Sequence, residues 1–253
     1  MDTQREIQLK ALDVLDSDLK TLVTKLLQYC DDFCIELTAE QANLCVEHLL
    51  YVEQVNHYIN LTRITNLDEA LVLHILDSLA LLQSLPPDLN SFLDMGTGPG
   101  FPGVPIGIAT GCNGILLDSV GKKVNVVNAI LNQLDLKTLK AVHERTELYA
   151  SQNHCFDCVV ARALGPIPLL LEYGRPFLQL GSSLVIAKAN PPEGELASGE
   201  KVAEMLGLEL DGFDEFDLPN DLGHRVVYTY MAVERSRVKL PRTPGLAKKN
   251  PLA

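Results

Sequence analysis

The stretch FLDMGTGPGFPGVPIGIAT, residues 92–110, decides the fold class. It opens as a short apolar strand that ends at the carboxylate of Asp94, and a glycine-rich turn follows that strand. The glycines of this turn are Gly96, Gly98, Gly100 and Gly103. Such a turn lets a ligand approach bare backbone. Nucleoside triphosphates, dinucleotides and S-adenosylmethionine are all bound by glycine turns after strands, so the rest of the sequence has to distinguish between them.

The segments that follow residue 91 alternate between strand and helix patterns, which is typical of a parallel sheet covered on both faces. The predicted strands are 92–95, 114–118, 139–142, 158–161, 183–187, 208–216 and 225–233. Helical spacing of apolar residues predicts helices at 121–134 and 198–206. The first 85 residues read as helices only, and Pro86 and Pro87 end that part. We therefore expect a helical extension at 1–87, an α/β domain at 88–233 and a basic tail at 234–253.

Composition limits the class of protein. The chain has 253 residues, 47% of them hydrophobic, which is enough for a full core, and it has no apolar signal region or membrane-length apolar run. We therefore expect a soluble, cytoplasmic protein. The net charge of −12 argues against bulk attraction to nucleic acid, but the charge is uneven. The basic, proline-containing tail resembles an extended arm suited to phosphate backbones, or else a solvated disordered end.

Two cysteines form a CxxC motif, Cys155 and Cys158, preceded by His154. This motif lies in an apolar, β-branched segment, and residues three apart on a strand face opposite sides of a sheet. A second ligand pair at zinc-finger spacing is missing. We expect reduced structural thiols and no metal site.

The choice of ligand follows from charge. A phosphate loop needs GxxxxGK, and no lysine follows these glycines. A dinucleotide is harder to exclude, because the turn contains GxGxxG and Asp118, twenty residues after Gly98, is placed to hold ribose hydroxyls. However, Asp94 would repel a pyrophosphate, whereas it suits the α-ammonium group of S-adenosylmethionine. Charge therefore favours the methyl donor, and the alternative for Asp94 is a turn-capping residue.

Several motifs together resemble the RsmG (GidB) family of bacterial small-subunit 16S rRNA (guanine-N7) methyltransferases. The motifs are NLT at 60–62, HILDS at 74–78, DMGTGPGFPGVPIGIA at 94–109, LLDSVGKKV at 116–124, FDCVVARAL at 156–164 and PRTPGLAKKNPL at 241–252. The resemblance implies a Rossmann-like class I S-adenosylmethionine-dependent methyltransferase fold, with a seven-stranded, mostly parallel sheet and an N-terminal helical extension. It also implies 16S rRNA or the small ribosomal subunit particle as the partner, and we expect no membrane, no metal and a monomer.

The residues expected to bind the methyl donor are predicted from two sources, the charge argument and the family resemblance. The charge argument gives Asp94 and Asp118 beside Gly98. The resemblance implies donor contacts from Gly96, Phe101, Thr146, Glu147 and Arg162. Phe101 is expected to lean on the donor, and Arg162 is expected to face the catalytic crevice, with a rim salt bridge as its alternative role.

No general base is needed, because guanine N7 has a free lone pair and sheds no proton when it is methylated. Catalysis is then positioning and electrostatics. His74, Asp77 and Ser78 share one helix face, and we expect a hydrogen-bonded cluster there rather than a catalytic triad. Leu73 stands where the family usually has an arginine, so an Arg–Asp pair with Asp77 is expected to be absent.

RNA contacts are expected from cations in the last third of the chain. The candidates are Lys188, Arg225, Arg242, Lys248 and Lys249. Two rival functions remain at this stage: a methyltransferase that acts on a small molecule or a protein, and a non-catalytic or NAD-type nucleotide-binding protein.

Overall fold

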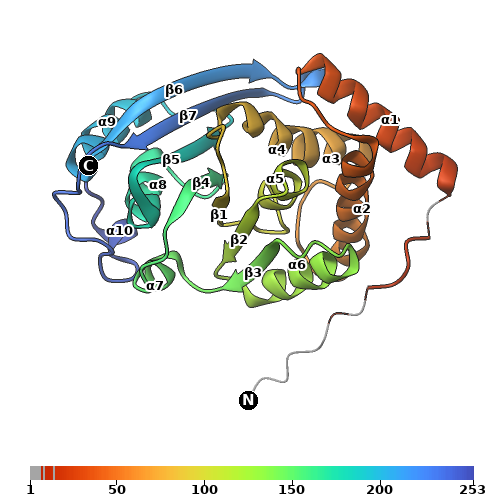
Figure 1. Ribbon diagram of the computed structural model, residues 1–253, viewed down its shortest axis with the longest axis horizontal. Helices are drawn as coiled ribbons and strands as arrows, with labels where there is room; N and C mark the ends of the chain where they lie inside the picture. Colours follow the sequence, from red (N-terminus) through yellow and green to blue (C-terminus); the bar gives the residue numbers. More distant parts are fainter. Residues whose placement is uncertain (1–6, 8, 14) are drawn as a thin grey trace.

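A seven-stranded sheet forms the centre of the computed structural model, which describes residues 7, 9–13 and 15–253 (Figure 1). The strands are β1 (Ser91–Met95), β2 (Asn113–Asp118), β3 (Leu139–His143), β4 (Phe156–Arg162), β5 (Leu178–Lys188), β6 (Leu208–Asp217) and β7 (His224–Ala232). Their order is β3-β2-β1-β4-β5-β7-β6. The first five pair in parallel, and β7 runs antiparallel to both of its neighbours. The predicted seven-stranded, mostly parallel sheet is confirmed.

Helices connect the strands and cover both faces of the sheet. They are α5 (Gly103–Thr110), α6 (Gly121–Gln133), α7 (Thr146–Ala150), α8 (Ile167–Gly174) and α9 (Glu195–Leu206). After β3 the chain crosses to the other side of β1 and enters β4, so the strand order reverses between β1 and β4. Ligands of open α/β sheets bind at this reversal, beyond the carboxyl ends of the strands. The glycine turn follows β1 and therefore lies at that place.

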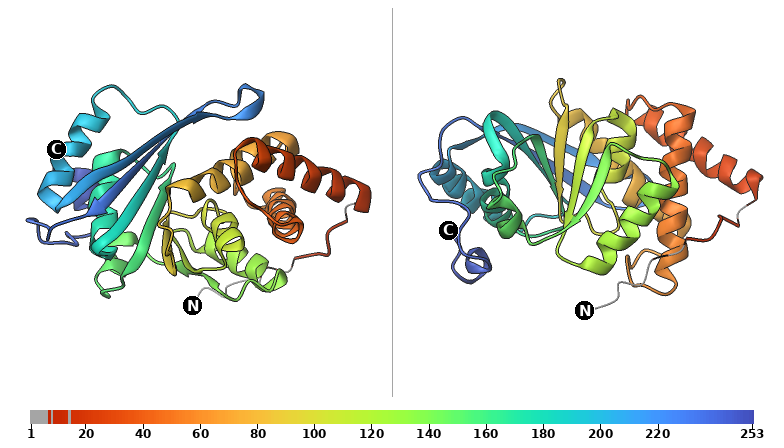
Figure 2. Two further views of the ribbon diagram at one scale, coloured as in Figure 1. Left: turned by 45° about the horizontal axis from the view of Figure 1, so that its top comes forward. Right: turned by 60° about the horizontal axis from the view of Figure 1, so that its bottom comes forward.

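The N-terminal helices pack on one face of the sheet, and α8 and α9 pack on the other (Figure 2). The extension consists of α1 (Asp16–Asp32), α2 (Ala39–Asn56), α3 (Leu67–Ala70), the π-helical turn η1 (Leu71–Leu76), α4 (Asp77–Leu79) and the 3₁₀ turn η2 (Ala80–Ser84). Thr38 and Gln41 form the capping box expected from the sequence. Buried residues of these helices share one apolar cluster with β1, α5 and α6. The extension is thus part of the sheet's own core.

The C-terminal tail is folded, and the expectation of an extended or disordered arm is wrong. Its last helix, α10 (Leu246–Lys249), inserts Ala247 into the apolar cluster around α8, where this side chain is only 3% exposed. Val238 and Leu240 pack against the same cluster. Proline, glycine and lysine dominate the tail's composition, but these few apolar side chains are enough to dock it.

The CxxC motif is not a site in this structure. Cys155 is exposed and lies just before β4, and Cys158 is buried within that strand, so the prediction that both lie on one strand and face opposite sides is not met. Within the described ranges, no cluster of three or more His, Cys, Asp or Glu side chains is suited to a metal ion. No helix among the same residues is both long and apolar enough to span a membrane.

Candidate active site

Backbone hydrogen bonds and positive φ angles fix the glycine turn. The N–H groups of Gly96 and Thr97 donate to the Leu117 carbonyl at the end of β2, at 2.8 and 3.0 Å. Gly98 has φ +58° and Gly100 has φ +102°, which L side chains rarely adopt. A Cβ built on Gly98 would meet nothing within 4 Å beyond its chain neighbours. The backbone at Gly98 is therefore open to a ligand.

Asp118 lies at the carboxyl end of β2 and joins this turn to the next one. Its Oδ2 accepts the N–H of Gly98 at 2.9 Å, and its Oδ1 accepts the N–H of Val120 at 2.8 Å. Each carboxylate oxygen has a second lone pair, so both can still accept a hydroxyl group. The position agrees with the expected ribose contact, which stays a prediction.

Asp94 is wholly buried beneath the same turn. Its Oδ2 accepts the N–H of Gly103 at 2.8 Å, so the carboxylate does hold the turn where α5 begins. Its Oδ1 has no hydrogen-bond partner among the described residues, and neither has the buried hydroxyl of Thr97. Burial raises the pKa of Asp94 to about 6, although the Gly103 N–H favours the charged form. Oδ2 therefore caps the turn, and the expected contact of Oδ1 with a cationic group stays a prediction.

Phe101 does not offer its ring to a ligand, which corrects the expectation that it leans on the donor. The ring is 5% exposed and stacks on His74, with centroids 4.6 Å apart and planes 3° apart. The ring of His48 packs against it at 4.6 Å. Burial lowers the pKa of His48 to about 4 and that of His74 to about 3, so both rings are neutral at pH 7. Donor contact from Phe101 is left to its backbone.

Thr146 and Glu147 open α7, directly after β3. The Glu147 side chain is buried, and its Oε1 accepts the backbone N–H of Gly245 at 2.8 Å and the Tyr173 hydroxyl at 3.3 Å. The carboxylate thus anchors the C-terminal tail, which leaves Thr146 and the backbone of α7 for the expected donor contact.

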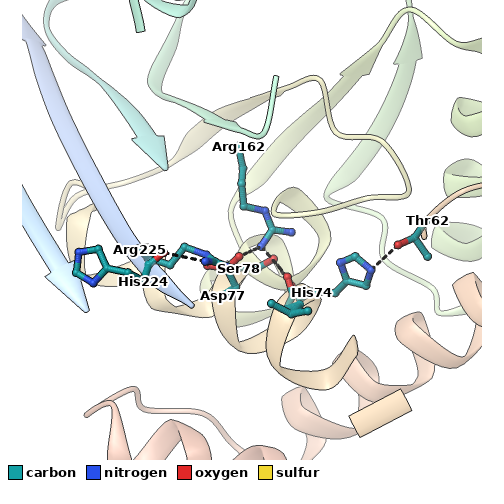
Figure 3. Close-up of polar contacts among 8 residues, drawn as sticks. Thr62, His74, Asp77, Ser78, Arg162, His224 and Arg225 are labelled. Atoms are coloured by element: carbon teal, nitrogen blue, oxygen red, sulfur yellow. Dashed lines mark hydrogen bonds and ion pairs between the residues drawn. The ribbon is translucent and has the colours of Figure 1, made fainter. Parts of the chain in front are cut away.

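Asp77 is held between two arginines (Figure 3). Arg162, the last residue of β4, donates to Asp77 Oδ2 at 2.9 Å, and Arg225, near the start of β7, donates to Oδ1 at 3.0 Å. The Arg–Asp pair that Leu73 seemed to remove is therefore supplied from two strands. These side chains line a cavity of about 520 Å³, here called the acceptor cavity. Its other walls are Ile64, Leu73, His74, Ala163, Gly165, Ala187, Lys188, Ala189 and Asn190.

His74, Asp77 and Ser78 form no catalytic triad, which agrees with the expectation of a hydrogen-bonded cluster. The His74 Nε2 atom lies 2.9 Å from the Thr62 hydroxyl, and the Ser78 hydroxyl donates to the backbone carbonyl of His74 (Figure 3). The Asp77 carboxylate faces the arginines instead. The π-helical turn that carries His74 is a geometry found frequently at functional sites.

Comparison with known proteins gives the family. The model of the GidB family, "rRNA small subunit methyltransferase G", matches residues 41–220. The ribosomal RNA small subunit methyltransferase G of Carboxydothermus hydrogenoformans is 33% identical over 234 residues, which is 90% of this chain and 99% of that protein. The Clostridium botulinum (strain ATCC 19397) protein of the same name is 32% identical over 88% of this chain and 95% of its own length.

The chain belongs to the rRNA small subunit methyltransferase G family. A solved geranyl diphosphate methyltransferase in complex with S-adenosylmethionine has a TM-score of 0.52 at 10% identity, covering 65% of this chain and 90% of that one. This likeness concerns the fold alone, a class I methyltransferase fold. Family membership makes the chain an enzyme of the methyltransferase class and decides against the non-catalytic and NAD-type alternatives.

Three of the five cations expected to contact RNA are ion-paired with acids in the structure. Lys188 pairs with Glu195 at 2.8 Å, Arg225 pairs with Asp77, and Arg242 makes a two-fold contact with Glu172 at 2.7 and 2.5 Å. Their side chains are only 12–16% exposed. Lys188 and Arg225 do reach the crevice, since both line the acceptor cavity. Glu195 balances the charge of Lys188, whereas Arg225 and Arg162 share the one carboxylate of Asp77, so one positive charge stays uncompensated there. Lys248 and Lys249 are exposed on α10.

Two of the acids that organise this region were not found from the sequence. Asp77 was considered only with its helix neighbours, whereas its partners lie 85 and 148 positions further along the chain. Glu172 holds the tail through Arg242, 70 positions away. Neither pair has a local spacing signal. The one available hint was a carboxylate on an apolar helix, since such a group needs a partner when it is buried.

Proposed function

We propose that this protein transfers the methyl group of S-adenosylmethionine to N7 of a guanine in 16S rRNA. The observation that carries the proposal is the open glycine turn at the strand reversal, with two carboxylates beneath it and the arginine-lined acceptor cavity next to it. Such a site takes a cationic, phosphate-free cofactor on one side and a polar base on the other. Family membership supports the same reaction.

For the donor, each polar group meets a matching protein group in this proposal. The free Oδ1 of Asp94 accepts the α-ammonium, and the oxygens of Asp118 accept the ribose hydroxyls. The open backbone at Gly98 lets the methionine part lie close to the sheet, whereas Gly96 is covered by the side chain of Leu164. The adenine lies along the start of α7 at Thr146. When bound, the donor supplies an electrophilic methyl group.

For the acceptor, the acceptor cavity holds a guanine by its O6 atom. Arg162 uses Nη1 for Asp77 and the Leu73 carbonyl, so its other N–H groups are available to donate to O6. N7 lies beside O6 on the same edge of the base and must stay free of donors so that its lone pair can attack the methyl group. No proton leaves N7, which is why no residue has to act as a base. The neutral histidines add no positive charge against the cationic product.

The proposed roles need no residue from a second chain, and we propose that the enzyme acts as a monomer. Because 16S rRNA is found in the cytoplasm, we propose that the enzyme acts there, on the free RNA or on the small-subunit particle.

The test is methyl transfer from labelled S-adenosylmethionine to unmethylated 16S rRNA and to small-subunit particles. The modified nucleotide is then located by borohydride reduction and aniline cleavage, which act at N7-methylguanine. Label that enters RNA without producing a cleavage site would place the methyl group on another atom. Label that enters no RNA but enters a protein or a small molecule would refute the proposal.

A further inference from the structure

A second hollow of about 710 Å³ lies next to the acceptor cavity and is not used by the proposed reaction. Four prolines give it a rigid apolar lining, and we call it the proline pocket. Its walls are Leu164, Gly165, Pro166, Pro168, Leu169, Pro192, Glu193, Gly194, Glu195, Ser198, Ala247, Lys248, Pro251 and Ala253. They come from the loops after β4 and β5, from α8 and α9 and from the C-terminal tail.

The two hollows share a wall at the carboxyl ends of β4 and β5. Lys188, which lines the acceptor cavity, donates to the carbonyl of Gly165 at 3.0 Å and pairs with Glu195 Oε1 at 2.8 Å. Gly165 borders both hollows. Glu195 Oε1 also accepts the N–H of Ile167 at 2.7 Å. A molecule bound in the acceptor cavity is therefore separated from the proline pocket only by this shared wall.

The charges of the proline pocket favour a nucleobase inside the pocket and a phosphate group outside it. Glu195 is buried in its wall, where Lys188 balances its charge, and its Oε2 can accept the amino group of a base. The exposed carboxylate of Glu193, in the same lining, disfavours a phosphate inside the pocket. Proline and leucine side chains offer apolar surface to the face of a base. Lys248 lines the pocket and Lys249 follows it on exposed α10, so a phosphate can be met outside the pocket.

The tail that carries these lysines is fixed in place. Arg242 contacts both oxygens of buried Glu172, and the Gly245 N–H donates to buried Glu147. Both carboxylates belong to the methyltransferase core, on α8 and α7. The lysines are therefore held beside the crevice by the fold and need not be ordered by the RNA.

We infer that the proline pocket binds an unpaired nucleobase next to the target guanine, with its amino edge toward Glu195 and its phosphate on Lys248 and Lys249. Proteins read single-stranded RNA by splaying bases out of the stack into such pockets. The inference rests on the proposed function, since it takes the neighbouring acceptor cavity as the guanine site. The pocket and its two lysines would give a protein of net charge −12 a local RNA-binding site.

Filling the pocket tests the inference. Ser198 lines the proline pocket from α9, and its exposed neighbour Ala197 does not, so Ser198→Trp and Ala197→Trp form a matched pair. Affinity for 16S rRNA is measured by filter binding, and affinity for S-adenosylmethionine by calorimetry. We expect Ser198→Trp to weaken RNA binding about tenfold or more, as for the loss of one stacked base, with unchanged donor affinity and melting temperature. Equal RNA affinity in the two variants, or weakened donor binding in Ser198→Trp, would overturn the inference.

A second experiment removes the positive charge of Lys248 at the edge of the proline pocket. Lys248→Ala is compared with Lys201→Ala, which removes an exposed lysine from α9 outside the pocket. We expect only Lys248→Ala to flatten the salt dependence of 16S rRNA binding, by about 0.7 in the log–log slope. An equal slope in both variants contradicts the phosphate contact. These binding measurements do not need turnover: if the wild type binds through the pocket but methylates no guanine N7, the proposed function fails and the pocket stands.

Discussion

Asp94 makes the donor site sensitive to pH near neutrality. Its pKa is raised to about 6 by burial, and we propose that only its ionised form accepts the donor's ammonium group. About one carboxylate in eleven is then ionised at pH 5 and about ten in eleven at pH 7. The affinity for S-adenosylmethionine should therefore fall about tenfold between pH 7 and pH 5. Calorimetry across this range measures the fall directly.

Asp94→Asn is the matching variant, because it keeps an oxygen for the Gly103 N–H and removes the titration. We expect its donor affinity to be about tenfold to a hundredfold weaker at pH 7, as for one lost charge-assisted hydrogen bond, and flat between pH 5 and pH 7. The two histidines packed on Phe101, His48 and His74, do not blur the result, since their pKa values of about 4 and about 3 lie below the range. Any effect of the other histidines is common to both proteins, so the difference between the two slopes reports Asp94. A wild-type affinity that does not change with pH, or a variant that retains the wild-type slope, would refute the role given to Asp94.

The same carboxyl also predicts the pH dependence of stability. Its pKa in the folded protein, about 6, is raised above the ordinary value of 3.8, so its contribution to the free energy of unfolding is full below pH 3.8 and is lost as the pH rises through 6. The loss amounts to about 3 kcal/mol at most. Without donor, Asp94→Asn should therefore be more stable than the wild type at pH 8 and not at pH 4. Urea unfolding at both values measures the difference.

Three further substitutions probe the rest of the site. Asp118→Ala should weaken donor binding about tenfold in calorimetry, because it loses the ribose acceptors and releases the backbone N–H groups that Asp118 holds. Arg162→Ala should lower kcat at least tenfold while thermal unfolding changes little, because Asp77 keeps Arg225; normal turnover would reduce Arg162 to a rim salt bridge. Arg242→Ala leaves Glu172 buried without its partner, so we expect a loss of about 3 kcal/mol in urea unfolding and early proteolysis of the tail; an intact tail would contradict its anchoring role.

Sequence patterns were sufficient for the sheet because strands and helices are encoded by local periodicity. The segment 208–216 was predicted as a strand, and β6 spans Leu208–Asp217. The predicted 183–187 covers only the second half of β5, Leu178–Lys188. The first half includes Leu180, which is 61% exposed, and pairs with β4 only at Phe156, across a bulge. Without a buried face it has no alternating pattern to detect.

The charges of the site were harder to predict, because a sequence gives the sign of a side chain and not its partner. Lys188 and Arg242 were expected to be free for RNA, and both are bound to buried carboxylates. The tail was taken for an arm because its composition is that of a linker, yet a single buried residue, Ala247, helps to dock it. In each case tertiary contacts over long separations override the local composition.

The two ion pairs of Asp77, with Arg162 and Arg225, have a consequence for the folding of the chain during its synthesis. The glycine turn and the carboxylates of β1 and β2 are complete once residue 118 has been synthesised. The acceptor cavity, in contrast, needs Arg225, which lies 148 positions after Asp77 on the last strand of the sheet. A nascent chain therefore carries the sequence of the glycine turn early, but the acceptor cavity cannot close until synthesis is almost finished. Products of translation or proteolysis that end before β7 have the sequence of the turn but lack one of the two arginines that hold Asp77.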